Sequence, residues 1–112
     1  MTESNFKFFT EVSEPKFSNP LYNSSADELY LEVSGDFTSC TLNVYGLMGS
    51  PYKPEDRSNL TKLAGVNMSN FAVTTSIQGK GVYAYSITPF STIVVEVAAV
   101  DGSIDVFGRT TR

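Results

Sequence analysis

Hydrophobic and polar residues alternate along most of the chain after residue 27, with the period of two that half-buried β-strands show. In residues 28–34, for example, Leu29, Leu31 and Val33 fall on one side and polar residues on the other. Residues 92–100 carry the strongest pattern, and Val94 breaks it, which predicts that part of this strand is covered on both faces. The expected strands span residues 28–34, 40–46, 60–66 (a strand or a short turn), 71–77, 81–87, 92–100 and 103–108.

Glycine and proline mark the expected turns between these segments. The clearest short turns are at residues 34–36, 79–81 and 88–91, and residues 48–59 read as a long surface loop. Asp101-Gly102 is the most hairpin-like dipeptide, because both central residues of a type I′ turn need positive φ. We therefore predict a two-residue hairpin there that joins the last two strands, with Gly102 at positive φ.

About seven short strands with regular turns predict one small all-β domain, a β-sandwich of Ig-like or jelly-roll-like type, over residues 28–112. No long helical period and no internal repeat appear. Cys40, the single cysteine, is expected to be a small buried hydrophobe. The predicted core includes Leu31, Val33, Leu42, Val44, Tyr83, Ile93, Val95 and Val106.

Residues 1–27 differ from the rest, because phenylalanines lie among polar residues and two prolines interrupt any regular element. The pattern predicts an extended N-terminal arm. Exposed aromatic clusters usually contact something, so we expect the arm to dock on a neighbouring subunit or another protein. The alternative is an edge strand packed on its own domain. The expected docking residues are Phe6, Phe8, Phe9, Phe17 and Tyr22.

The charge of the chain argues against two classes of partner. The net charge is −4 and no run of Lys or Arg exists, so the basic footprint of a nucleic-acid-binding protein is missing. Adhesion to an anionic membrane surface is disfavoured for the same reason. The N-terminus does not resemble a signal peptide, and no stretch reaches the roughly 18–20 apolar residues of a membrane span. We therefore expect synthesis in a cytoplasm.

Enzymatic constellations are missing from the sequence. The chain has no histidine and one cysteine, so a Ser-His-Asp triad, a Cys-His pair and a zinc site are excluded. No glycine-rich phosphate loop precedes a helix. The carboxylates at Glu55, Asp56, Asp101 and Asp105 read as solvated turn residues. We expect a protein that is not an enzyme, with no catalytic residues, no metal site and no cofactor.

The tyrosines leave an alternative function open. Tyr30, Tyr45, Tyr52, Tyr83 and Tyr85 include candidates for a sugar-stacking platform, although tyrosines that alternate along strands are more often packing residues. A carbohydrate- or receptor-binding module is therefore the alternative to a purely structural role.

Residues 28–108 carry a series of short motifs. Two strands end in glycine at Leu31-Glu32-Val33-Ser34-Gly35 and Val44-Tyr45-Gly46, and a leucine-rich segment follows at residues 60–63. Ile77 then leads through two glycines to Val82-Tyr83, and the chain ends in a strand at 93–97, the Asp101-Gly102 turn and a strand at 105–108. This pattern resembles small β-sandwich virion proteins of tailed bacteriophages.

The resemblance implies a role in particle architecture, as a capsid decoration protein, a head-fibre component, or a tail or neck component. It also implies several copies per virion, with contacts to other copies or to capsid, portal or tail proteins. Residues 1–27 resemble the subunit-linking arms of such proteins. Fold does not determine function, so these implications stand as expectations.

Overall fold

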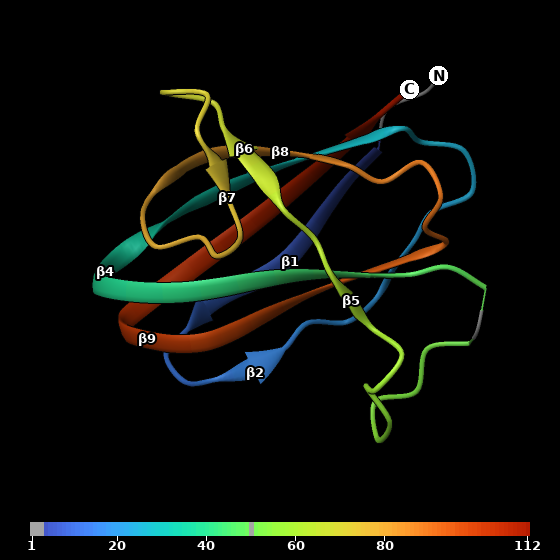
Figure 1. The fold of residues 1–112 in the computed structure, drawn as a ribbon. Helices are drawn as coiled ribbons and strands as arrows, with labels where there is room; N and C mark the ends of the chain where they lie inside the picture. Colours follow the sequence, from blue (N-terminus) through green and yellow to red (C-terminus); the bar gives the residue numbers. More distant parts are fainter. Residues whose placement is uncertain (1–3, 50) are drawn as a thin grey trace.

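The computed structural model describes residues 4–49 and 51–112, and these residues form β-strands and no helix (Figure 1). All strand pairs belong to one antiparallel sheet with the order β1-β9-β4-β8-β6-β7, in which β2 and β3 also pair with β9 and β5 pairs with β4. The strands are β1 (Ser4–Val12), β2 (Lys16–Phe17), β3 (Leu21–Tyr22), β4 (Glu28–Leu47), β5 (Thr61–Lys62), β6 (Gly65–Asn67), β7 (Val73–Thr74), β8 (Gly81–Ser86) and β9 (Thr92–Thr111).

The two longest strands, β4 and β9, build both layers of the domain. Each has 20 residues, and Figure 1 shows each running to one end of the molecule, bending there and returning across the core. They pair along their whole length, with Leu31 opposite Gly108 before the bend and Val44 opposite Val95 after it. One sheet thus folds over itself into a sandwich-like domain, which confirms the predicted all-β class.

The first layer contains β1, β8, β6 and β7 together with the halves of β4 and β9 that lie near residues 28–37 and 103–111. The second layer contains β2, β3 and β5 with the other halves of β4 and β9.

The hairpin predicted at Asp101-Gly102 is wrong. Both residues lie inside β9, where Asp101 pairs with Ser39 and Gly102 pairs with Phe37. Gly102 does have positive φ, at 124°, as predicted. The turn predicted at residues 34–36 is likewise part of β4. Glycine at positive φ bends a strand without reversing it, and two β-bulges add to the bend, with Thr38 as the extra residue in β4 and Ala98 as the extra residue in β9.

The core lies between the two layers and agrees with the predicted set, since all eight of those residues are buried. The inward-facing positions are odd-numbered in residues 29–33 and even-numbered in residues 40–44, because the one extra residue at the β4 bulge, Thr38, changes the phase of the strand. Val94 is also buried, as its place in the pattern predicted, and so is Cys40, as a free thiol.

The structure differs from the expected N-terminal arm. Residues 4–22 follow the outer edge of β9 around its bend, first as β1 and then as β2 and β3. The unpaired backbone groups of β9 need partners, and this segment supplies them. The edge-strand alternative is the arrangement seen for residues 4–22, which belong to the same sheet as residues 28–112. Residues 1–3 of the expected arm lie outside the described residues.

Candidate functional site

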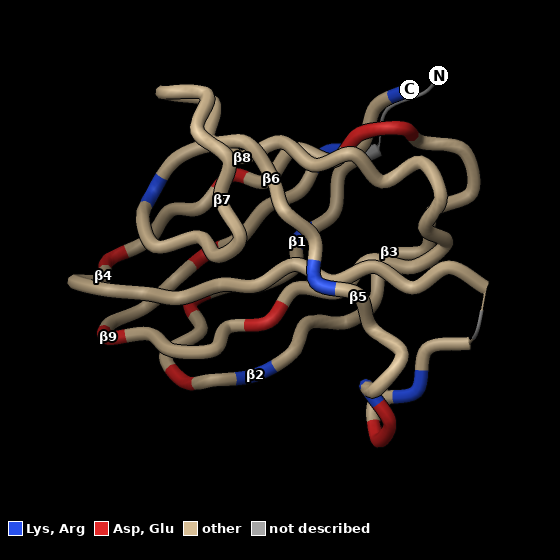
Figure 2. Tube along the Cα trace, viewed as in Figure 1, with Lys and Arg blue, Asp and Glu red and all other residues tan. Residues whose placement is uncertain are grey.

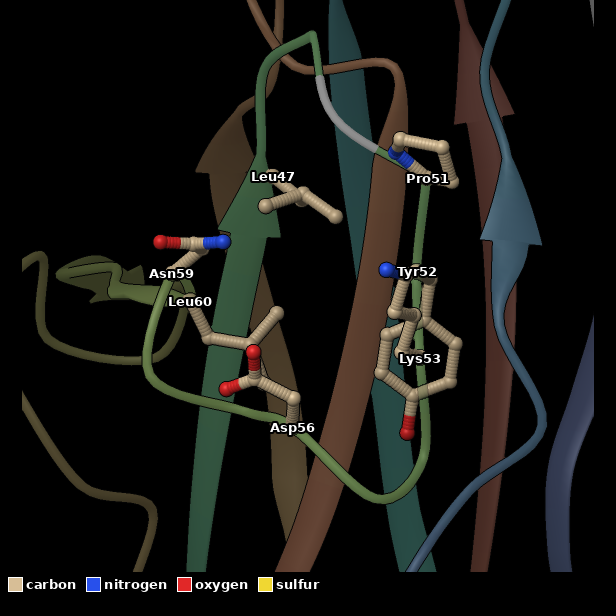
Figure 3. Close-up of a pocket in the computed structure, with 7 residues that line it drawn as sticks. All are labelled: Leu47, Pro51, Tyr52, Lys53, Asp56, Asn59 and Leu60. Atoms are coloured by element: carbon tan, nitrogen blue, oxygen red, sulfur yellow. The ribbon is translucent and has the colours of Figure 1, made fainter.

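A cavity of about 220 Å³ lies where the loop after β4 folds back beside the end of that strand (Figure 3). This loop, residues 51–60, matches the long surface loop predicted for residues 48–59 apart from Ser50, which lies outside the described residues. The residues that line the cavity are Leu47, Pro51, Tyr52, Lys53, Asp56, Asn59 and Leu60.

Side-chain contacts hold this loop in place. The guanidinium of Arg57 lies 3.8 Å from the centre of the Phe17 ring, a cation–π contact, and its Nε donates to the Tyr52 hydroxyl at 3.4 Å. The backbone N and the Oγ of Ser58 donate to Asp56 Oδ1 at 3.2 and 2.7 Å. These bonds stabilise the charged carboxylate and lower the pKa of Asp56.

The cavity combines an apolar floor with polar groups at its rim. Leu47 is buried and Leu60 is half-buried, whereas Lys53, Asp56 and Asn59 are exposed. An ammonium, a carboxylate and an amide beside the Tyr52 ring suit a small hydroxyl-bearing group or one polar side chain of a partner. Among residues 4–49 and 51–112, no group of three or more His, Cys, Asp or Glu residues is placed to hold a metal ion.

The five residues expected to dock on a partner do not form one surface. Phe8 and Phe9 are buried in the core, and Phe6 packs edge-on against Phe8 with ring centres 4.8 Å apart. Phe17 is half-buried beneath Arg57, with its ring centre 6.0 Å from that of Tyr45. Tyr22 is 71% exposed. Tyr22 is thus the open member of the set.

The tyrosines also fail to make one stacking platform. Tyr83 and Tyr85 are buried in the core, Tyr30 lies on the first layer and Tyr45 on the second. The Tyr45 hydroxyl donates to Glu96 at 2.8 Å. Burial, together with this bond to a carboxylate, raises the pKa of Tyr45 to about 12. Tyr52 lies at the cavity, beside Lys53, Asp56 and Asn59.

A second hollow was not anticipated from the sequence. A shallow groove of about 250 Å³ crosses the outer face of the first layer and is lined by Tyr30, Glu32, Val82, Phe107 and Arg109. The signal was available, because Val82 and Phe107 are large apolar residues at positions whose strand neighbours point inward.

Two solved structures share this fold. The SPBc2 prophage-derived protein YomS superimposes with a TM-score of 0.82 at 22% sequence identity, over 98% of this chain and 93% of that one. The PBSX exported protein XepA superimposes with a TM-score of 0.87 at 20% identity, over 98% of this chain and 38% of that one. No family model and no curated protein sequence matches the chain. No helix among the described residues is long and apolar enough to cross a membrane.

Proposed function

We propose that the protein is a non-enzymatic structural component of a bacteriophage, located in the virion and present in several copies. The observation that carries this proposal is the fold, shared over 98% of the chain with a prophage-derived protein and with part of a PBSX protein. The role fits a capsid decoration, head-fibre, or tail or neck component. Its partners would be other copies of itself or other virion proteins.

The way the fold recurs supports a building-block role. It accounts for 93% of YomS but only 38% of XepA, so it occurs both nearly alone and beside other structure. Figure 2 shows Lys and Arg at scattered positions along the chain trace, in both layers and in the loop, with Asp and Glu between them. This distribution disfavours binding to nucleic acid.

Particle purification tests the proposal. Particles of the phage that encodes this chain would be banded by density, and the chain would be quantified in the band and in the cleared medium by mass spectrometry. We expect it in the particle band, at several copies per particle. XepA is described as exported, and a chain found free in the medium but absent from particles would contradict the virion role and favour an exported one.

The cavity favours a second candidate, a carbohydrate- or receptor-binding module. A glycan array tests it with the wild-type protein and the variants Tyr52→Ala and Asn59→Ala. Binding that both variants lose would support this function. Met48→Ser is the matched control, because Met48 is 62% exposed and does not line the cavity. The absence of any glycan signal, or a signal unchanged in both variants, would reject the cavity as a sugar site.

A further inference from the structure

We infer that the outer face of the first layer is the surface on which a second copy of this chain docks. This inference rests on the proposed multi-copy function and names the surface that would serve it. The face is defined here as the outward side chains of β1, β9, β4, β8, β6 and β7 in the first layer, and it includes the groove between Tyr30 and Phe107.

Exposed apolar side chains gather on this face. Residues in cross-strand register share a face, and one such row runs from Tyr30 through Ala84 and Val66 to Val73. Seven large hydrophobic side chains are exposed in the described part of the chain. Five of them lie on this face or in the β6–β7 turn at its end: Met68, Phe71, Val73, Val82 and Phe107.

The two outer faces of the domain differ in how far other parts of the chain cover their apolar side chains. On the second layer, Phe17 packs against Tyr45, and Arg57 from the 51–60 loop lies over the Phe17 ring. None of residues 4–49 and 51–112 covers the groove on the first layer in this way, and Val82 and Phe107 are 40% and 39% exposed. An apolar strip left open on one side only is the mark of an intermolecular contact.

The charges around the strip make a second copy the occupant that fits. Acidic Glu28 and Glu32 lie on β4, while basic Arg109 lies on β9 and Lys7 on β1. Glu28 and Glu32 lie on the strand next to that of Arg109, yet no ion pair joins either glutamate to Arg109. Arg109 instead donates to Asn5 at 3.2 Å, Glu28 accepts from Tyr30 at 2.9 Å, and Glu32 and Lys7 have no partner in the described chain.

A two-fold arrangement satisfies these charges. A two-fold axis in the plane of the interface, equidistant from Glu32 and Arg109, would place Glu32 of each copy over Arg109 of its partner. The unlike charges of Glu32 and Arg109 would then meet across the interface, with the exposed Phe107 of each copy between them.

A charge exchange tests the inference on the full chain. Self-association would be measured by analytical ultracentrifugation over a wide concentration range for the wild type, Glu32→Arg, Arg109→Glu and the double variant. We expect each single variant to weaken association by about tenfold and the double variant to recover most of it. High salt should weaken wild-type association. Circular dichroism melts of all four proteins would verify that each is folded.

A truncation of the apolar strip gives an independent measure. Phe107→Ser should weaken association by about tenfold or more, since an aromatic side chain near the centre of an interface contributes strongly. Tyr22→Ser is the matched control, because it also removes an exposed aromatic from a strand and lies off the proposed face, on the second layer. We expect that variant to associate like the wild type.

The outcomes separate this inference from the proposed function. A chain that stays monomeric at all concentrations, or that associates equally well with Phe107→Ser and the charge variants, would overturn the inference. Loss of association in Tyr22→Ser alone would overturn it in favour of the N-terminal segment. Self-association through this face by a chain that is absent from purified particles would contradict the virion role and leave the interface standing.

Discussion

Gly35 on β4 and Gly102 on β9 lie on neighbouring strands at the bend between the two layers, both with φ of 124°. Each occupies a place where a side chain would meet the opposite strand. A Cβ on Gly35 would lie 2.5 Å from the carbonyl oxygen of Ser103, and a Cβ on Gly102 would lie 2.6 Å from Cα of Phe37. Because glycine has no side chain, the two strands can approach this closely at the bend, and one sheet can form both halves of the sandwich.

Gly102→Ala should therefore destabilise the domain by about 2 kcal/mol or more, since the variant combines a disfavoured φ with a backbone clash. The free energy of unfolding from urea titration measures this. Gly79→Ala is the control, because a Cβ there meets nothing within 4 Å. Equal stability of the two variants would show that the bend does not depend on glycine.

Val95→Asp should abolish folding. Val95 is fully buried between the layers, and an unpaired charge there is costly relative to the total stability of a small domain. The expected result is the loss of a cooperative thermal transition. Val73→Asp makes the same chemical change at a side chain that is 73% exposed, and should melt like the wild type. A cooperatively melting Val95→Asp protein would mean that the strand faces are assigned wrongly.

The sequence predicts the strand faces well, because period-two alternation depends on burial alone and burial is what sorts side chains such as Leu31 and Val95. It predicts the connections less well. Asp101-Gly102 carries a hairpin signal, but the same positive φ serves a bend inside a continuous strand, and only pairing with a distant segment decides between the two.

Phe8 and Phe9 show that the sequence also does not determine which partner a predicted site residue contacts. Their apolar character predicts a contact, and the structure places that contact within the chain, against the core. The cavity at Asp56 could not be predicted from the sequence for a related reason. Its lining comes from the end of β4 and from loop residues whose approach depends on Arg57 reaching Phe17, 40 positions earlier in the chain, and no local pattern encodes such a contact.

Phe9→Ala should cost about 3–5 kcal/mol of stability, because Phe9 is only 4% exposed and its removal leaves a cavity in the core. Tyr22→Ala, in the same N-terminal segment, should change the free energy of unfolding by no more than about 0.5 kcal/mol, since Tyr22 is exposed. Chemical denaturation of both variants decides the role of the segment. A docking arm that leaves the domain predicts no loss of stability for either variant.

Alkaline pH should weaken the fold through Tyr45. Its pKa rises from 10.0 to about 12 in the folded protein, because burial and the bond to Glu96 favour the neutral phenol. A group whose pKa is raised by folding contributes stability that is fully present below its unfolded pKa and is lost as pH rises through the folded one. The loss from Tyr45 should therefore fall between about pH 10 and pH 12.

Tyr45→Phe tests this assignment. At neutral pH the variant should lose about 1 kcal/mol with the bond to Glu96, and above pH 10 its stability should decline less steeply than that of the wild type. Urea titrations across the alkaline range measure both effects. Burial also raises the pKa of Tyr85, so Tyr85→Phe should reduce the alkaline decline as well. If both variants decline as steeply as the wild type, another group governs the alkaline loss and the role given to these tyrosines is wrong.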